Sequence, residues 1–298
     1  MPNTNKQILI IGSGTMGSGI AHTFAQFQFK VFLFDSNTAA LDRAMQQIST
    51  NIERQIAKGS IPPSEKELIL TRITPTSDLQ VAAQACSLAI EAVPESPDIK
   101  REVFQSLDQY CTPDTILASN TSSISITKLA SYTKRPGNVI GMHFMNPVPL
   151  MPLVEVINGL QTSEATTQQI IEISKQIHKT PVCTADYPGF ISNRILMPMI
   201  NEAIYCLHEG VAGIAEIDQI MKLGMTHPMG PLQLADYIGL DVCLNILHVL
   251  YDGFGNPKYA PCPLLVNMVQ AGLLGNKTKK GFYDWADSKN LTPNNIIK

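Results

Sequence analysis

The sequence has little charge, no excess of basic residues and no long uninterrupted apolar run. Charged residues make up 16% of the 298 residues, and the formal net charge is −3 at pH 7. A chain of this kind offers no basic surface for nucleic acid. No apolar run reaches membrane-spanning length, and the first residues lack the apolar stretch and cleavage site of a signal peptide. We therefore expect a cytoplasmic protein that has no nucleic-acid or membrane partner.

Cysteine pairing of the kinds that build disulfide frameworks or metal centres is also missing. The six cysteines show no CxxC pair and no spacing typical of metal ligands. We interpret them as reduced packing residues and expect no metal site. The residues concerned are Cys86, Cys111, Cys183, Cys206, Cys243 and Cys262.

The first two thirds of the chain alternate between short apolar runs and amphipathic stretches, which predicts a mostly parallel sheet covered on both faces. The predicted strands are Gln7–Ile11, Val31–Asp35, Ser87–Ala92, Thr115–Ser119, Val139–Phe144, Leu153–Ile157 and Pro181–Thr184. The predicted helices begin at Thr15, run from Thr38 to Gly59, and occupy Pro97–Tyr110 and Ser163–His178. Ser64 and Glu67 form a capping-box pattern for a further helix that ends near Thr71.

The pattern changes at Asp186–Gly189, and no convincing strand follows. Helical periodicity continues over Phe190–His208, Ile214–Leu223, Leu232–Tyr251 and Pro263–Ala271, and Pro198 is expected to kink or break the first of these. We expect an α/β domain of the Rossmann type over residues 1–187 and an all-helical domain over residues 188–298.

A glycine-rich motif lies between the first predicted strand and helix. Gly12, Gly14 and Gly17 form GxGxxG together with Ser13, Thr15 and Met16. The motif alone is weak, but here it follows a strand and opens a helix, which is the context of a dinucleotide site. Gly12 would permit the tight turn, Gly14 would let the backbone approach a pyrophosphate, and Gly17 would let helix and strand pack closely. The free N–H groups of the helix N-terminus suit phosphate.

Asp35 ends the second predicted strand and is expected to bind the adenine ribose hydroxyls of NAD. No arginine follows it closely, since the next residues are Ser36, Asn37 and Thr38. A 2′-phosphate beside this carboxylate would be repelled by roughly 4 kcal/mol per charge pair at an effective dielectric constant near 20. The sequence therefore predicts selection against NADP, although a solvated loop aspartate is the alternative.

Polar residues follow the later strands of the predicted sheet. Ser122 comes after one strand, His143 lies near the end of the next, and Glu155 lies within the strand that follows. Ligands of open α/β sheets bind at the carboxyl ends of the strands. A histidine suits the removal of a hydroxyl proton during hydride transfer, and a carboxylate on its other nitrogen would fix the tautomer. We therefore interpret His143 as the base and Glu155 as its orienting acid, while structural roles stay open for both.

Five segments closely resemble the 3-hydroxyacyl-CoA dehydrogenase family, especially its bacterial 3-hydroxybutyryl-CoA members. They read IGSGTMGSGIA, ASNTSSISIT, VIGMHFMNPVPLMPLVEVI, DYPGFISNRILMPMINEA and HPMGPLQLADYIGLD. The resemblance extends from Lys6 to Trp285 and implies that His143 and Glu155 are the catalytic pair. It implies that Ser122 binds the 3-oxygen of the substrate, with Ser123 as a rival, and that Asn193 completes the site.

The resemblance also implies contacts to the cofactor and to coenzyme A. Cofactor contacts near the nicotinamide are implied for Glu91, Lys100, Asn120 and Asn146, and for a lysine before the final GFY. Lys277 is the best match for that lysine, with Lys279 and Lys280 as alternatives. Arg54 and Lys58, four residues apart on the long helix, would bind the CoA phosphates, although a solvated helix face could also place them there.

The activity implied is reversible NAD-dependent oxidation of a short-chain (S)-3-hydroxyacyl-CoA, most simply 3-hydroxybutyryl-CoA, by a homodimer paired through its helical domain. Fatty acid and butanoate metabolism both use this chemistry. Two alternatives stay open. One is an L-gulonate or other sugar-acid 3-dehydrogenase similar to lambda-crystallin, and the other is a non-enzymatic NAD-binding protein.

Overall fold

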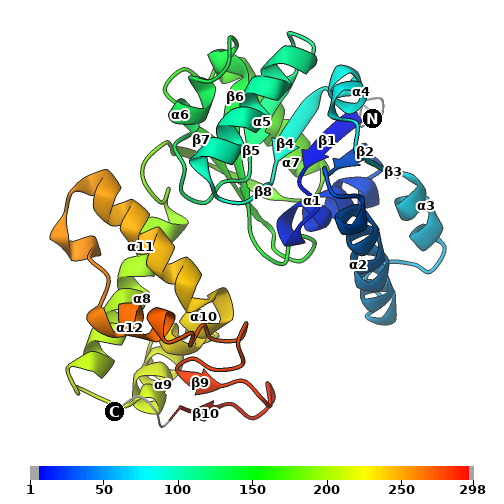
Figure 1. Cartoon of the computed structure of the whole chain (residues 1–298). Helices are drawn as coiled ribbons and strands as arrows, with labels where there is room; N and C mark the ends of the chain where they lie inside the picture. The colour runs from blue at the N-terminus through cyan, green and yellow to red at the C-terminus, as the bar shows by residue number, and fades with distance from the viewer. Residues whose placement is uncertain (1–6, 295–298) are drawn as a thin grey trace. The chain divides into compact units, whose positions relative to one another are not determined.

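The computed structural model describes residues 7–294 (Figure 1). The chain divides into two compact units, with the boundary in the sequence between Tyr187 and Pro188. Residues 1–6 belong to the segment that we expect to lack a signal peptide, and they lie outside the described residues. Each unit has its own apolar core.

An eight-stranded sheet forms the centre of the first unit, in the order β3-β2-β1-β4-β5-β6-β7-β8. All neighbouring strands pair in parallel except β6 and β7, which are antiparallel. This is the mostly parallel Rossmann-type sheet that the sequence predicts. The strands are β1 Gln7–Ile11, β2 Lys30–Phe34, β3 Ile73–Thr76, β4 Leu88–Glu91, β5 Ile116–Ser119, β6 Val139–Phe144, β7 Leu153–Asn158 and β8 Thr180–Ala185.

Helices cover both faces of this sheet because the side chains of each central strand alternate between two cores. Ile8 and Ile10 of β1 share one core with helices α1, α2 and α7. Leu9 and Ile11 are equally buried and point to the other face, which α4, α5 and α6 cover. The helices are α1 Thr15–Gln26, α2 Thr38–Ala57, α3 Glu65–Thr71, α4 Leu79–Ala85, α5 Pro97–Tyr110, α6 Ile126–Ala130 and α7 Glu164–Gln176, with the 3₁₀ turn η1 Pro136–Asn138.

Three elements of this unit were not expected, and one predicted cap is wrong. Strand β3 and the short helices α4 and α6 have too few residues for a clear apolar period. Ser64 has helical backbone angles of −64° and −21°, and its side chain makes no capping hydrogen bond to helix α3. An N-cap needs an extended backbone, so the predicted capping box does not form.

The second unit consists mainly of five helices: α8 Ser192–His208, α9 Ile214–Gly224, α10 Pro231–Ile238, α11 Leu240–Phe254 and α12 Pro263–Gln270. The single helix expected over Leu232–Tyr251 is wrong, because Gly239 has φ +106° and divides it into α10 and α11. Helix α8 continues through Pro198, so the helix is not broken there, and the expected kink stays a prediction. The unit also contains the turn η2 Pro257–Tyr259 and a two-residue strand pair, β9 Tyr283–Asp284 with β10 Thr292–Pro293, which the sequence did not predict.

The buried carboxylate of Asp236 binds the C-terminal segment to helix α10. Asp236 of α10 accepts hydrogen bonds from the backbone N–H groups of Phe282 (2.9 Å) and Tyr283 (2.8 Å) and from the indole Nε1 of Trp285 (2.9 Å). A Cβ atom at Gly281 would lie 1.9 Å from Asp236 Oδ1, so only glycine fits there. The final GFYDW segment is therefore part of the core of the second unit.

Within residues 7–294, no single helix is long and apolar enough to span a bilayer. The pair α10 and α11 passes the same test of length and composition when taken together, but the two helices meet at a bend of 97°.

Candidate active site

The GxGxxG turn joins β1 to α1, and each of its glycines meets a different requirement. Gly12 has φ +98°, and a Cβ there would lie 2.6 Å from the carbonyl oxygen of Ala92. A Cβ at Gly17 would lie 1.8 Å from the carbonyl oxygen of Gly12. A Cβ at Gly14 would meet nothing within 4 Å, because this residue faces open space. The turn therefore leaves room for a ligand at Gly14 and brings the N–H groups at the start of α1 toward it.

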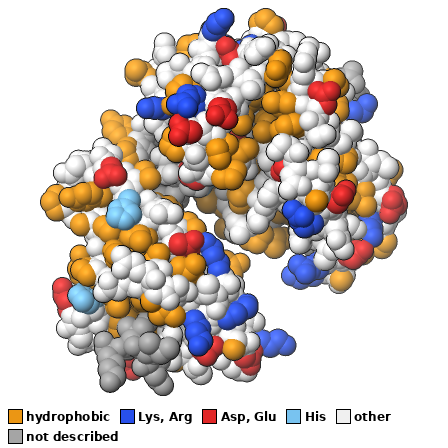
Figure 2. Space-filling model, viewed as in Figure 1, with side chains coloured by type: hydrophobic (Ala, Val, Ile, Leu, Met, Phe, Trp, Pro, Cys, Tyr) orange, Lys and Arg blue, Asp and Glu red, His pale blue; other side chains and the backbone are white. Residues whose placement is uncertain are grey.

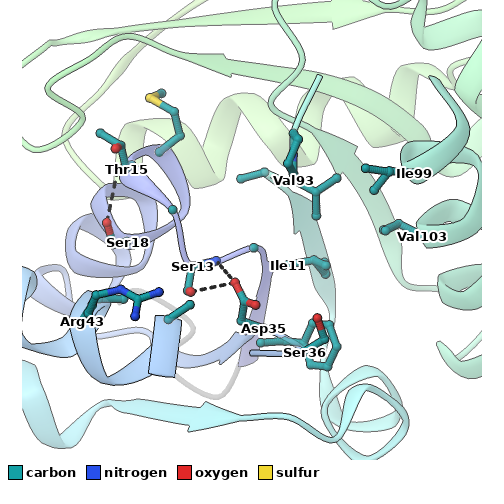
Figure 3. A pocket seen from close by; sticks show the side chains of 18 of the residues that line it. Ile11, Ser13, Thr15, Ser18, Asp35, Ser36, Arg43, Val93, Ile99 and Val103 are labelled. Atoms are coloured by element: carbon teal, nitrogen blue, oxygen red, sulfur yellow. Dashed lines mark hydrogen bonds between the residues drawn. The ribbon is translucent and has the colours of Figure 1, made fainter. Parts of the chain in front are cut away.

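A cavity of about 800 Å³ extends along this turn (Figure 3). Its lining includes Gly12–Met16 of the turn, Asp35 and Ser36 after β2, and Ala92, Val93 and Ile99. Thr15 and Met16, which the sequence assigns to the cofactor with the three glycines, belong to this lining. Its size and mixed lining suit a dinucleotide.

Asp35 is held as an acceptor at the end of β2. One of its oxygens accepts from the backbone N (2.9 Å) and hydroxyl (2.7 Å) of Ser13, and the other accepts from the backbone N of Asn37 (3.0 Å). Partial burial alone would raise the pKa of the Asp35 carboxyl, but these hydrogen bonds and the charge of Arg43 outweigh that effect and lower it. Asp35 is therefore an ionised acceptor at neutral pH.

Arg43 is a residue of this cavity that sequence reasoning missed. It lies on α2, exposed, and lines the cavity together with Asp35. Figure 3 shows its side chain directed toward the hydrogen-bonded Ser13–Asp35 pair. Arg43 follows Asn37, the N-cap of α2, by six residues, and no sequence motif marks it as part of the cavity. The lining of the cavity near Ser13 thus includes one acidic and one basic side chain.

Ser122, His143 and Glu155 form a hydrogen-bonded chain near the carboxyl ends of β5 and β6. His143 Nδ1 lies 2.7 Å from Glu155 Oε2, and His143 Nε2 lies 3.0 Å from Ser122 Oγ. The side chains of His143 and Glu155 are 8% and 5% exposed. If the ionised Glu155 accepts the Nδ1 proton, Nε2 carries the lone pair and can receive another proton. The geometry of this chain suits a general base held by a carboxylate.

The neighbouring serines have different partners. Ser123 Oγ donates to Glu95 Oε1 over 2.8 Å, whereas Ser122 Oγ lies beside the imidazole. Of the two candidates for binding the 3-oxygen, Ser122 is the one beside His143. The N-cap of helix α6 is Ser125, whose side chain accepts from Lys128 N.

Glu91 and Lys100, expected to contact the cofactor, lie beneath the site. Their side chains are 0% and 1% exposed, and Lys100 Nζ lies 2.6 Å from Glu91 Oε1. Glu91 also accepts from Val93 N (2.8 Å) and Ser119 Oγ (2.6 Å). With both side chains enclosed in this way, their polar atoms bind one another and the strand ends, and their contacts with NAD stay predictions.

Asn120 and Asn146 lie at the ends of β5 and β6, where the nicotinamide contacts were expected. Asn120 Oδ1 accepts from the backbone N of Phe144 over 2.8 Å and thereby joins the ends of β5 and β6. Asn146 is exposed and precedes Pro147 by a cis peptide bond. Their contacts with NAD stay predictions.

The remaining predicted residues lie on helices or near the C-terminus. Arg54, in the last turn of α2, and Lys58, its C-cap, are exposed. Basic and acidic side chains intermix on the face of the molecule that Figure 2 shows. Asn193 is buried at the start of α8, and its backbone N donates to Gly189 O over 3.2 Å. Lys277 forms an ion pair with Asp241, with Nζ–O distances of 2.8 and 2.9 Å. The roles of these four residues toward substrate or cofactor stay predictions.

Glu95 is another residue that sequence reasoning missed, and it lies beside Ser122. Its carboxylate lies 3.1 Å from Lys100 Nζ and accepts hydrogen bonds from the turn that contains Ser122. Its place shortly after the end of β4 was the available signal, because residues there face the ligand edge of the sheet.

Comparison with known proteins agrees with this geometry. Residues 7–187 match the family "3-hydroxyacyl-CoA dehydrogenase, NAD binding domain", and residues 189–285 match its C-terminal domain. The chain is 51% identical over 282 residues to a probable 3-hydroxybutyryl-CoA dehydrogenase of Bacillus subtilis, covering 95% of this chain and 98% of the relative. It is 53% identical over 276 residues to a protein of the same description from Deinococcus radiodurans, covering 93% and 99%.

A solved structure resembles the whole molecule. The (S)-3-hydroxybutyryl-CoA dehydrogenase of Ralstonia eutropha superposes with a TM-score of 0.91 at 45% identity, covering 95% of this chain and 99% of that one. The match of both domains explains why a glycine turn that fits a dinucleotide accompanies a histidine–carboxylate pair. The chain is a member of the 3-hydroxyacyl-CoA dehydrogenase family and an NAD-dependent oxidoreductase.

Proposed function

We propose that the protein oxidises short-chain (S)-3-hydroxyacyl-CoA reversibly to 3-ketoacyl-CoA, with 3-hydroxybutyryl-CoA as its substrate. The names of the relatives support the choice of the 3-hydroxybutyryl group as the acyl chain. The observation that carries the proposal is the chain from Ser122 Oγ through His143 to Glu155, with contacts of 3.0 and 2.7 Å. A secondary alcohol needs one base at the oxygen, and this chain of contacts supplies one.

In the proposed mechanism, Nε2 of His143 accepts the proton of the 3-hydroxyl group. Glu155 stabilises the resulting imidazolium through Nδ1, and the Ser122 hydroxyl donates a hydrogen bond to the 3-oxygen. Bound NAD supplies a hydride acceptor at C4 of its nicotinamide. In the opposite direction His143 returns the proton to the oxygen, so the same residues serve both directions. Acid–base catalysis of this type contributes roughly a hundred- to ten-thousandfold in rate.

Arg54 and Lys58 are the proposed contacts for the phosphates of coenzyme A. The two residues are separated by one helical turn, and the backbone N of Lys58 donates to Arg54 O over 3.2 Å at the end of α2. Both side chains are exposed. An arginine fork can bind phosphate through two hydrogen bonds, and the lysine adds a second positive charge.

We also propose roles for two residues of the second unit, a dimer and a cellular location. Asn193 is proposed to contact the substrate and Lys277 the cofactor. The helical unit is proposed to pair with a second copy, supported by apolar side chains exposed on it, including Ile195, Val211 and Leu223. We propose a cytoplasmic enzyme of fatty acid or butanoate metabolism.

The experiment that tests the function is a substrate panel measured by NADH oxidation. Acetoacetyl-CoA should turn over fastest among 3-ketoacyl-CoA thioesters of increasing length, and NADPH should be a poor substitute for NADH. Activity on L-gulonate with NAD but none on acetoacetyl-CoA would favour a sugar-acid dehydrogenase. Tight NADH binding without turnover of any substrate would indicate a non-enzymatic protein.

A further inference from the structure

A buried lysine binds the loop that joins β6 to β7. Lys179 lies between α7 and β8 and is 7% exposed. Its Nζ atom donates to the carbonyl oxygens of Val148 (2.6 Å) and Met151 (2.8 Å), which belong to that loop. The neighbouring backbone N of Thr180 donates to Pro152 O over 2.7 Å. The segment that begins β8 therefore holds the second half of the loop.

The ammonium group of Lys179 binds neutral partners. None of the ion pairs formed within residues 7–294 includes Lys179. Burial lowers the pKa of this group, as it does when a cation leaves water without a counter-ion. A buried charge of this kind is costly, so an apolar side chain would suit the position better if packing were its only role. The lysine is therefore explained by the two carbonyl oxygens that it binds.

The loop forms a compact turn. Pro147 O accepts from the backbone N of Leu150 and from that of Met151, both over 3.0 Å. Val148 is buried, and a Cβ at Gly19 of α1 would lie 3.0 Å from its side chain, so the loop also packs closely against α1. The turn is thus bound to α1 through one side chain and to the ammonium group through two carbonyl oxygens.

Asn146 lies between this turn and strand β6. Its side chain is exposed and is predicted to contact the nicotinamide. On its N-terminal side, Phe144 N donates to Asn120 Oδ1 over 2.8 Å at the end of β6. On its C-terminal side, Pro147 is the acceptor of the turn that Lys179 holds. The backbone of Asn146 is therefore held from both sides, and the lysine supplies one of the two attachments.

We infer that Lys179 is a positioning residue for the nicotinamide end of the cofactor, which acts by holding the β6–β7 loop and with it Asn146. The inference rests on the proposed function, because it assumes that Asn146 contacts the nicotinamide. Loss of the ammonium group should let the turn move and weaken that contact. The glycine turn after β1 and Asp35 should still bind the rest of the cofactor.

Calorimetric titration of the whole chain with two ligands tests this route. NADH carries the nicotinamide, and ADP-ribose lacks it. We expect Lys179→Met to raise the Kd of NADH about three- to tenfold, as for the loss of one hydrogen bond, and to leave the Kd of ADP-ribose within about twofold. Lys175→Met, which removes an exposed lysine from the last turn of α7, should match the wild type with both ligands. A general loosening of the first unit would instead raise both Kd values together.

A double-mutant cycle tests whether Asn146 carries the effect. Asn146→Ala should raise the Kd of NADH by a similar factor. The double variant Lys179→Met/Asn146→Ala should lie within about twofold of either single variant, because effects on one interaction are not additive.

Three results would overturn the inference. The first is an equal rise of both Kd values in Lys179→Met, and the second is an unchanged Kd of NADH in that variant. The third is a multiplicative effect in the double variant, which would mean that Lys179 acts independently of Asn146. If Lys179→Met fails to fold, Lys179→Gln keeps a neutral donor of shorter reach and should still raise the Kd of NADH alone. An unchanged ratio of the two Kd values in Lys179→Gln would then contradict the positioning role.

These titrations contain no acyl-CoA, so they separate the inference from the proposed substrate. A wild type that binds NADH but does not reduce acetoacetyl-CoA would refute the proposed function, while an NADH-specific rise of the Kd in Lys179→Met would still support the positioning role. An active wild type whose Kd of NADH equals that of Lys179→Met would refute the positioning role alone.

Discussion

His143 and Glu155 face each other across the antiparallel pair of strands β6 and β7, at the same register position. Directly opposed residues of such a pair have Cβ atoms about 4.5–5.5 Å apart, which allows the 2.7 Å contact between Nδ1 and Oε2. The orientation of the imidazole therefore depends on the pairing of two strands, because both residues lie on strands and not in a loop.

The first prediction concerns this pair. His143→Gln should lower kcat by about two to four orders of magnitude, because it removes the proton acceptor, while the Kd of NADH stays within about twofold. Glu155→Gln should lower kcat less, since it removes the charge that stabilises the imidazolium but leaves the base. Stopped-flow reduction of acetoacetyl-CoA and NADH fluorescence measure the two quantities. Near-normal turnover by His143→Gln would refute the assignment.

The second prediction concerns the choice between NAD and NADP. Asp35→Ala should lower the NAD/NADP ratio of kcat/KM by up to about a thousandfold, because it removes a repulsion of roughly 4 kcal/mol. Arg43 lines the same cavity and should then attract the 2′-phosphate, so the Asp35→Ala/Arg43→Ala variant should lose much of the gain with NADP. Calorimetric titration with 2′-AMP checks binding directly. Asp42→Ala, at an exposed position on α2, is the control. An unchanged ratio in Asp35→Ala would show that the carboxylate does not select the cofactor.

The third prediction concerns coenzyme A. The Arg54→Ala/Lys58→Ala variant should have a KM for acetoacetyl-CoA raised about tenfold or more at low salt, with kcat largely retained, because charged contacts remote from the reacting carbon contribute to binding. The difference should shrink as ionic strength rises. Gln46→Ala, exposed on the same helix, serves as the matched control. An identical KM in the variant and the wild type would remove these residues from the binding site.

The fourth prediction concerns the C-terminal segment. Gly281→Ala should destabilise the second unit by about 1–3 kcal/mol or more, because the added Cβ would lie 1.9 Å from Asp236 Oδ1. Gly224→Ala, where a Cβ meets nothing within 4 Å, should be neutral. Urea unfolding followed by the fluorescence of Trp285, the single tryptophan, reports on this region. Equal midpoints for the two variants would contradict the steric explanation.

The fifth prediction concerns pH. Burial raises the pKa of Asp236 to about 6, against the opposing effect of its three N–H donors. Its protonated form is therefore favoured in the folded state, and the stability it contributes is complete below pH 4 and is lost as pH rises to about 6. The loss amounts to about 3 kcal/mol for a shift of about two pKa units. The wild-type free energy of unfolding minus that of Asp236→Asn should fall over this range and stay constant above it. A difference that increases with pH would mean that the donors outweigh burial.

Much of the first unit could be predicted because its signals are local. The helix Pro97–Tyr110 and the strand Val139–Phe144 have the predicted bounds. Strand β3 was missed because its sequence, ITPT, contains a proline, which an edge strand tolerates but a sequence pattern does not suggest. The break at Gly239 was missed because its neighbours are apolar on both sides and nothing local requires a positive φ there.

Parts of the candidate site depend on residues far apart in sequence. Glu95 is separated from Thr121 by 26 positions, so the contact follows from the pairing of β4 with β5 and not from any motif. The enclosure of Glu91 and Lys100 likewise arises from packing across α5. Sequence reasoning identified residue types at the strand ends but could not predict which of their side chains are enclosed and which are exposed, because burial depends on packing between distant segments.

The reversal of β7 also has an evolutionary consequence. A β-hairpin, from Val139 to Asn158, brings the imidazole and the carboxylate together through the register of its two strands. Changes elsewhere in the chain can therefore accumulate while this pairing is kept. Recombination that exchanged the second unit would leave the strand pairing in place, whereas an insertion of one residue within either strand would shift its register and separate the two side chains.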